Sequence, residues 1–143
     1  MLIISFEILN KYDDSKYLLL SKKLTETSRL VCEGQQNDMD FSLVKEVSEE
    51  DYFNMIENKT AVLIGCCYMF GGIVSDLNTK DINILYEVGK NLGIAFQLED
   101  DLLDSFGDEA KFGKKIGGDI IEQKKTLLFI FTQAKLNGNQ RVE

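Results

Sequence analysis

The sequence predicts an all-α fold, a bundle of long helices forming one domain over residues 1–143. The chain contains no proline, so nothing of that kind interrupts long helices. Apolar residues recur at helical spacing along most of the chain, and no segment alternates like a strand bounded by hairpin turns. The 44% of residues that are hydrophobic are sufficient for a core.

The segments that we expect to be helical span residues 2–10, 16–36, 48–69, 79–106 and 119–136. The third begins at Ser48, whose hydroxyl can cap free amides, and acidic residues follow it at the positive end of the helix dipole. We expect it to end before Gly71-Gly72. Between the second and third helices, residues 36–40 are polar and precede Phe41.

Charge and composition exclude several classes of function. The net charge of −8 makes a nucleic-acid partner unfavourable, because an acidic surface repels phosphate backbones. The chain has no histidine, so it cannot form a serine–histidine or cysteine–histidine hydrolase site by itself. Three cysteines, Cys32, Cys66 and Cys67, suggest a reduced cytoplasmic protein rather than a disulfide framework. The apolar stretch at residues 1–9 is too short to span a bilayer and predicts a core helix, without stable membrane insertion.

A line of polar side chains marks the segment GIAFQLEDDLLD. Gln97, Asp100 and Asp104 share one helical face, and Asp101 flanks it. The remaining surface is mostly apolar, so we expect the helix to be buried. Aligned carboxylates in a buried helix favour a Mg²⁺ ion, which takes oxygen ligands and joins carboxylates to substrate phosphates. By spacing alone, a solvated acidic face is an equal alternative.

Basic residues surround a glycine-rich segment downstream, at positions 111, 114, 115, 124 and 125. Lysines bind phosphate as point charges, and glycines allow an anion to approach the backbone. The segment lacks P-loop spacing, so an ordinary surface loop is the alternative. Lys59 shares a helical stripe with Met55 and Cys66, where it either extends to water or binds an anion. Gln35 and Asp38 share a face if their helix continues that far.

Four segments together resemble the trans-isoprenyl diphosphate synthases (polyprenyl synthetases): EGQQNDMDF, ENKTAVLIG, GIAFQLEDDLLD and KFGKKIGGDIIEQKKT. Their order and spacing match, and the resemblance covers essentially the whole chain. It implies the C-terminal part of a single isoprenoid-synthase domain. It also implies a homodimeric prenyltransferase of isoprenoid biosynthesis, which condenses an allylic diphosphate with isopentenyl diphosphate and releases pyrophosphate.

The resemblance also implies residue roles. The second aspartate-rich motif would bind Mg²⁺ through Asp100, Asp101 and Asp104, with Asp38 assigned to the same metal set. Catalytic roles would fall to the pair that contacts the allylic diphosphate and to the residue beside the motif: Lys59, Thr60 and Gln97. The residues implied to contact diphosphate are Lys59, Lys114, Lys125 and Gln35.

The first aspartate-rich motif of the family, DDxxD followed by arginines, does not occur in these 143 residues. Asp13-Asp14 is followed by Ser15, Lys16 and Tyr17, and the chain has two arginines, neither of which fits. We therefore expect the chain alone to have little or no synthase activity and to expose apolar helix faces that favour oligomers. Two alternatives are a non-catalytic homologue or regulatory subunit and, less favoured by the downstream motif, a class I terpene cyclase.

Overall fold

Over the ranges described, the regular secondary structure of the chain is helical. The computed structural model describes residues 2–108, 110, 113 and 116–136, and it contains no strand in those ranges. The long helices are α2 (Asp14–Phe41), α4 (Val62–Val74) and α5 (Thr79–Phe106). The shorter elements are α1 (Leu2–Leu9), α3 (Glu49–Ile56), the π-helical turn η1 (Glu57–Ala61), α7 (Gly118–Ile121) and α8 (Leu127–Lys135). The predicted all-α bundle is confirmed.

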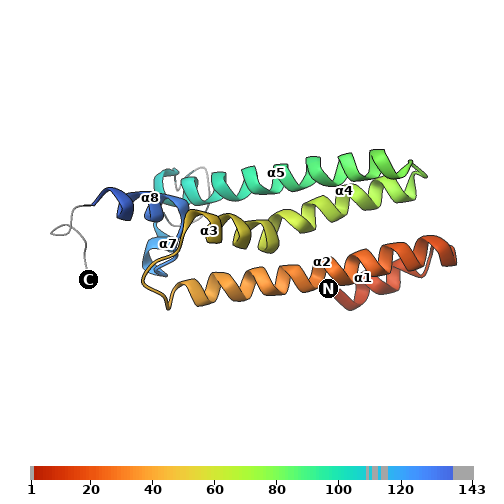
Figure 1. The fold of residues 1–143 in the computed structure, drawn as a ribbon, viewed down its shortest axis with the longest axis horizontal. Coiled ribbons are helices and arrows are strands. Elements are labelled where there is room, and N and C mark those ends of the chain that lie inside the picture. Colours follow the sequence, from red (N-terminus) through yellow and green to blue (C-terminus); the bar gives the residue numbers. More distant parts are fainter. Residues whose placement is uncertain (1, 109, 111–112, 114–115, 137–143) are drawn as a thin grey trace.

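The bundle is elongated, with α4 and α5 side by side as an antiparallel pair and α2 running along them (Figure 1). One apolar cluster joins α1, α2 and α4 through Leu9, Leu20, Leu24, Met69 and Ile73. A second lies where α7 and α8 close the other end, around Tyr52, Met55 and Ile56. The second cluster supports the candidate site.

Capping explains the helix starts that the sequence predicted. Ser48 and Asp51 form a capping box at the start of α3, and Asn78 caps α5 by accepting a hydrogen bond from the Asp81 amide. α2 continues through the polar stretch at residues 36–40, so Gln35 and Asp38 do lie on one helix. Gly71-Gly72 does not end α4, which continues to Val74.

The predicted last helix is wrong in its extent. The chain makes two helices, α7 and α8, in place of one over residues 119–136. Gln123 between them has φ of 57°, a left-handed conformation incompatible with a continuous helix. Thr126 then caps α8 by accepting from the Phe129 amide. The break turns the chain beside the end of α5.

The π-helical turn η1 packs unusually closely between α2 and α5. A Cβ on Gly34 of α2 would lie 2.3 Å from the Lys59 backbone nitrogen. On the other side, a Cβ on Gly93 of α5 would lie 2.5 Å from the Ala61 Cα. Both positions require glycine, because any side chain would displace the backbone of the turn. The two helices thus hold the segment that carries Lys59 and Thr60.

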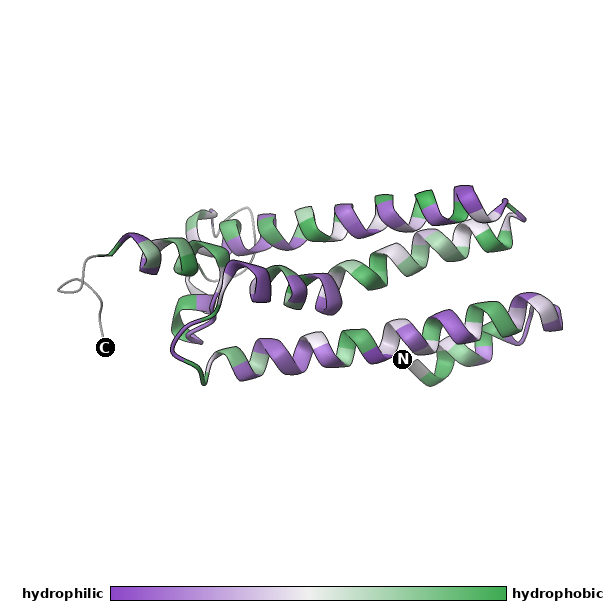
Figure 2. Cartoon of the chain, in the orientation of Figure 1, coloured by the Kyte–Doolittle hydropathy of each residue, from purple (hydrophilic) through white to green (hydrophobic). Residues whose placement is uncertain are grey.

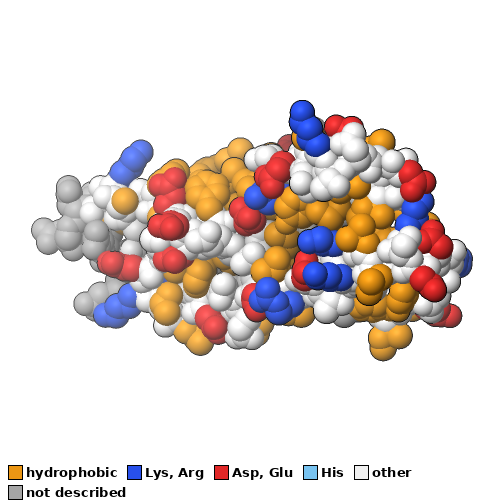
Figure 3. Space-filling model, turned by 45° about the vertical axis from the view of Figure 1, so that its right-hand side comes forward, with side chains coloured by type: hydrophobic (Ala, Val, Ile, Leu, Met, Phe, Trp, Pro, Cys, Tyr) orange, Lys and Arg blue, Asp and Glu red, His pale blue; other side chains and the backbone are white. Residues whose placement is uncertain are grey.

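Burial of α5 differs from the expectation. Hydrophobic residues lie along both α4 and α5 (Figure 2), but Leu92 and Phe96 of α5 are 50% and 57% exposed. Apolar side chains form broad patches on the surface in Figure 3. The residues buried along α5 are Gly89, Gly93 and Asp101. A separate expectation was that the chain, which lacks the first aspartate-rich motif, would expose apolar helix faces. The exposure of Leu92 and Phe96 confirms it. In the described part of the chain, no helix combines the length and apolarity needed to cross a membrane.

Candidate functional site

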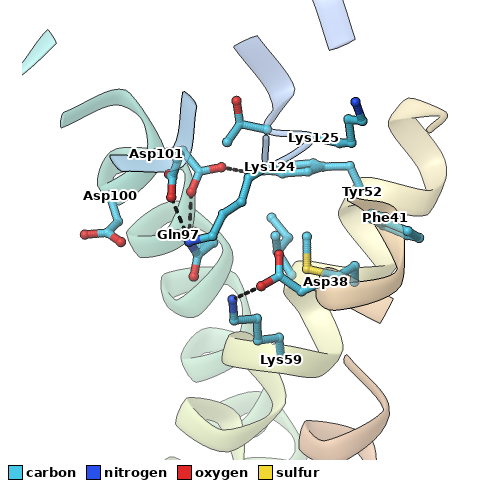
Figure 4. Close-up of a pocket in the computed structure, with 13 residues that line it drawn as sticks. Asp38, Phe41, Tyr52, Lys59, Gln97, Asp100, Asp101, Lys124 and Lys125 are labelled. Atoms are coloured by element: carbon cyan, nitrogen blue, oxygen red, sulfur yellow. Dashed lines mark hydrogen bonds and ion pairs between the residues drawn. The ribbon is translucent and has the colours of Figure 1, made fainter. Parts of the chain in front are cut away.

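A pocket of about 180 Å³ opens near the end of the bundle where α7 and α8 lie. Residues of α2, α3, η1, α5 and the segment from α7 to α8 line it, as the close-up in Figure 4 shows. Its described charged residues are four aspartates and three lysines: Asp38, Asp100, Asp101, Asp119, Lys59, Lys124 and Lys125. Apolar side chains of the second cluster form part of the wall. The site therefore combines carboxylates and ammonium groups at one end of a helical scaffold.

Lys59 and Asp38 meet across the pocket from η1 and α2. The Lys59 Nζ donates to Asp38 Oδ2 at 2.6 Å, as drawn in Figure 4. Lys59 lines the pocket and is 25% exposed, so its ammonium group stands at the site and does not extend away to bulk water. Gln35 lies exposed on α2 and does not line the pocket. Of the predicted α2 pair, the fold therefore brings only Asp38 into the site.

A line of hydrogen bonds crosses from η1 to α5 and on to α3. The Thr60 hydroxyl donates to Gln97 Oε1 at 2.9 Å, and Gln97 Nε2 donates to Asp101 Oδ1 at 2.9 Å. The Tyr52 hydroxyl donates to Asp101 Oδ2 at 2.6 Å (Figure 4). Asp101 is 7% exposed, although spacing placed it at the flank of the aspartate line. Both of its carboxylate oxygens thus have a protein donor.

Burial governs the titration of the two groups at the end of this line. It raises the pKa of the Tyr52 hydroxyl, and the hydrogen bond to Asp101 raises it further. Burial also raises the pKa of Asp101, while the donors Tyr52 and Gln97 oppose that shift. Tyr52 therefore remains a hydroxyl donor throughout the physiological range.

The other two aspartates of the motif have different surroundings. Asp100 lines the pocket and is partly buried. Asp104 does not line the pocket, and its Oδ2 accepts a hydrogen bond from the Asp119 amide at 3.0 Å. The Asp104 backbone oxygen accepts another from Gly117 at 2.7 Å. Asp104 thus anchors the start of α7 to the end of α5.

Two adjacent lysines supply positive charge from the segment between α7 and α8. The Lys124 Nζ lies 2.7 Å from Asp119 and 3.3 Å from Glu122. Burial lowers the pKa of Lys124, but the hydrogen bond and charge of Asp119, with those of Glu122, outweigh it and raise the pKa above its ordinary value. Lys125 Nζ stands 4.4 Å from the centre of the Phe129 ring. Lys114, a predicted diphosphate ligand, lies outside the described residues.

The polyprenyl synthetase family profile matches residues 1–143, the whole chain. This chain belongs to the polyprenyl synthetase family. It is 38% identical over 141 residues to a geranylgeranyl diphosphate synthase of Saccharolobus solfataricus, and 36% identical over 142 residues to a short chain isoprenyl diphosphate synthase of Methanocaldococcus jannaschii. Each match covers 96% of this chain and 42% of the relative, so the chain spans less than half of their length.

Solved structures agree on the fold of this chain. A geranylgeranyl pyrophosphate synthase superposes with a TM-score of 0.86 at 40% identity, covering 99% of this chain and 47% of that one. A polyprenyl synthetase of Streptomyces coelicolor superposes with a TM-score of 0.87 at 28% identity, covering 96% of this chain and 41% of that one. The helices thus form part of an isoprenyl synthase fold.

The donor groups at the pocket fit one kind of metal binding and not another. Among residues whose placement is described, no three carboxylate, thiol or imidazole groups gather into a metal site. A cage built by this part of the protein alone is therefore absent. Mg²⁺ commonly takes one or two carboxylates and completes its shell with substrate phosphates and water. Asp100 on the pocket wall fits that second arrangement, with lysines nearby to bind the same phosphates.

Three polar residues that line the pocket received no role from the sequence: Tyr52, Asp119 and Thr126. Lys124 was expected only as a member of the basic cluster. Tyr52 lies in an apolar stripe, which is typical of a core residue, and only its hydroxyl reveals the polar role. Asp119 lies inside the quoted glycine–lysine segment, so its motif was visible. Lys124 and Lys125 are adjacent, and no pattern distinguishes which of them pairs with Asp119.

Proposed function

We propose that this chain forms one wall of a prenyltransferase site that condenses an allylic diphosphate with isopentenyl diphosphate and releases pyrophosphate. The observation that carries the proposal is the pocket itself, where Asp100 shares a wall with Lys59, Lys124 and Lys125. Carboxylates hold a divalent cation, and ammonium groups bind the diphosphate that the same cation bridges. The names of the relatives, all diphosphate synthases, support this reaction class.

The reaction begins when the allylic C–O bond breaks and its electron pair leaves with pyrophosphate. The double bond of isopentenyl diphosphate then attacks the allylic carbon, and loss of a proton to pyrophosphate restores a double bond. Mg²⁺, when bound, would supply charge neutralisation at the diphosphate. The ammonium groups of Lys59, Lys124 and Lys125 would bind the departing pyrophosphate oxygens and stabilise their growing charge. No histidine base is required.

The chain alone is proposed to be inactive or nearly so. It spans 42% of the length of the two relatives above, and the first aspartate-rich motif, DDxxD followed by arginines, does not occur in these 143 residues, so the carboxylates that would face Asp100 are not among them. A facing wall is needed, because a diphosphate held from one side remains open to water. The family resemblance supports a cytoplasmic homodimer as the assembled form.

A chimera tests the proposal directly. The matching segment of the Saccharolobus solfataricus synthase is replaced by this chain, and elongation is followed with labelled isopentenyl diphosphate and an allylic primer. We expect prenyl diphosphate product from the chimera and none from the 143-residue chain alone. Asp100→Asn in the chimera should lower kcat at least about a hundredfold, and omission of Mg²⁺ should abolish turnover.

Two outcomes would contradict parts of this proposal. Elongation by the purified chain alone would show that a second wall is unnecessary. A folded, dimeric chimera without activity would favour a non-catalytic homologue or regulatory subunit, since the rest of the site comes from an active relative. Circular dichroism and sedimentation of the chimera serve as controls for folding and assembly.

A further inference from the structure

We propose that Asp101 is a positioning residue and not a metal ligand, and that Tyr52 holds it in place to fix the Gln97 amide at the pocket. The inference rests on the proposed function, because it assigns different roles to two aspartates of the motif in that site. Both aspartates line the pocket, but Asp101 is 7% exposed and both of its carboxylate oxygens accept hydrogen bonds from protein groups, whereas Asp100 is only partly buried. A line of hydrogen bonds runs from Tyr52 through Asp101 and Gln97 to Thr60.

The surroundings of Asp101 do not favour metal binding. Its Oδ2 accepts from the Tyr52 hydroxyl at 2.6 Å, and its Oδ1 accepts from Gln97 Nε2 at 2.9 Å. With 7% exposure, little of the side chain reaches open space. Turning it toward a cation would leave the buried hydroxyl of Tyr52 without its acceptor, which is unfavourable for a buried polar group.

The charge of Asp101 determines how Gln97 is oriented. The amide nitrogen of glutamine can only donate and its oxygen can only accept. A carboxylate at Asp101 therefore takes Nε2, which turns Oε1 toward the Thr60 hydroxyl, the donor at 2.9 Å. The reversed amide would place its oxygen against a carboxylate oxygen. Gln97 lines the pocket, so Asp101 sets which atom of that amide is available there.

Tyr52 is well placed to hold Asp101. Its side chain is 1% exposed, and its ring packs in the apolar cluster with Met55 and Ile56, so the hydroxyl cannot swing away. It stands on α3, two helical turns before Lys59. The line of hydrogen bonds therefore joins α3 and η1 to α5, the elements that carry Lys59 and Asp100. Loss of the Tyr52 hydroxyl should therefore weaken the attachment of α3 to α5 at Asp101 without changing the apolar packing of the ring.

Hydrogen exchange of the Gln97 side-chain amide tests the positioning role in the chain itself. The signal is assigned in a ¹⁵N-labelled sample by its loss in Gln97→Glu. We expect Asp101→Asn and Tyr52→Phe each to speed its exchange about tenfold. Tyr68→Phe, which changes a tyrosine on α4 outside the line, is the matched control and should leave the rate unchanged. A Gln97 amide that exchanges as fast as exposed Gln35 in the parent, or ignores both variants, would overturn the inference.

Cation binding separates the positioning role from ligation. Mn²⁺ is titrated into the parent chain with inorganic pyrophosphate present, and free Mn²⁺ is followed by electron paramagnetic resonance. Asp100→Asn removes an oxygen ligand that carries charge and should weaken Mn²⁺ binding clearly, whereas Asp101→Asn should weaken it much less. Equal losses would overturn the assignment of Asp101. A parent chain that binds no Mn²⁺ counts against the proposed metal site instead, and the exchange experiment still decides the role of Asp101.

Discussion

The ion pair between Lys59 and Asp38 is largely, but not completely, removed from water. Asp38 is 14% exposed and Lys59 25%, and their charged atoms lie 2.6 Å apart. A pair at this depth gains little net stability from attraction, because both groups lose hydration. The larger effect is the cost of removing one partner. In the pocket, the charge of Lys59 is therefore already balanced by Asp38. A bound diphosphate would compete with Asp38 for the ammonium group.

Replacing Lys59 with methionine should expose that cost. We expect Lys59→Met to lower the free energy of unfolding by about 1–3 kcal/mol, because the Asp38 carboxylate then lacks its partner in a partly dry site. Urea denaturation followed by circular dichroism measures the change. Asp38→Asn added to Lys59→Met is the control, and it should recover part of the loss by removing the stranded charge. A double variant no more stable than Lys59→Met would count against this account.

At the scale of elements, Asp104 joins α5 to α7. Its carboxylate accepts from the Asp119 amide, and its backbone oxygen accepts from Gly117. This places Asp119, and with it the partner Lys124, against the end of the aspartate helix. The motif position at Asp104 therefore has a structural use in the chain, independent of any cation.

Removing the Asp104 carboxylate should free α7. In Asp104→Ala we expect the Asp119 amide to exchange with solvent roughly tenfold faster, while amides of α4 keep their rates. Hydrogen exchange followed by NMR measures both. Asp104→Asn keeps a carbonyl oxygen that can accept the same bond, so it should restore much of the protection. Unchanged exchange at Asp119 in the alanine variant would mean that the contact does not hold the helix.

Close packing of η1 makes a second prediction for the elements. Gly34→Ala places a methyl group against the backbone of Lys59, and we expect it to lower the free energy of unfolding by about 1–3 kcal/mol. Gly71→Ala is the matched control, since nothing lies within 4 Å of the position a Cβ would take. Alanine there should leave stability unchanged or raise it by up to about 1 kcal/mol. Equal effects of the two substitutions in urea denaturation would contradict the packing argument.

The same elements show what sequence could predict. The start and end of α5 could be predicted from Asp81 in its first turn and Gly107 after its end, because helix-start and helix-stop residues act locally. The break between α7 and α8 has no such signal, since Gln123 is an ordinary residue in a left-handed conformation that its surroundings impose. The π-helical form of η1 was equally hidden, because no residue type marks it and its close packing against α2 and α5 appears only in the fold.

The site divides in the same way. The line of Gln97, Asp100 and Asp104 could be predicted, because side chains four residues apart on one helix share a face whatever surrounds them. Burial of Asp101 could not be predicted, since it depends on the Tyr52 hydroxyl from a different helix. Nor could spacing show that Gln35 points away from the pocket while Asp38 faces it. Spacing along one helix therefore predicts which side chains share a face, but it does not predict which side chains of other helices they contact.

At the scale of the whole molecule, α5 presents an uncovered apolar face. Ile84, Val88, Leu92 and Phe96 recur every four residues and are each 50–57% exposed. A stripe this regular is typical of a buried helix face. The chain spans 42% of the length of the Saccharolobus solfataricus relative, and in the chain itself this face is open to water.

This face should make the chain associate with itself, since contiguous exposed apolar surface favours burial against another copy. We expect sedimentation velocity of the 143-residue chain to show dimers or larger species whose proportion rises with protein concentration. Leu92→Glu with Phe96→Glu should shift the population toward monomer, because charges on the stripe are costly to bury. The same changes at the exposed but separate positions Leu18 and Leu43 serve as the control and should have less effect. A clean monomer of the parent chain at high concentration would show that the stripe does not drive association.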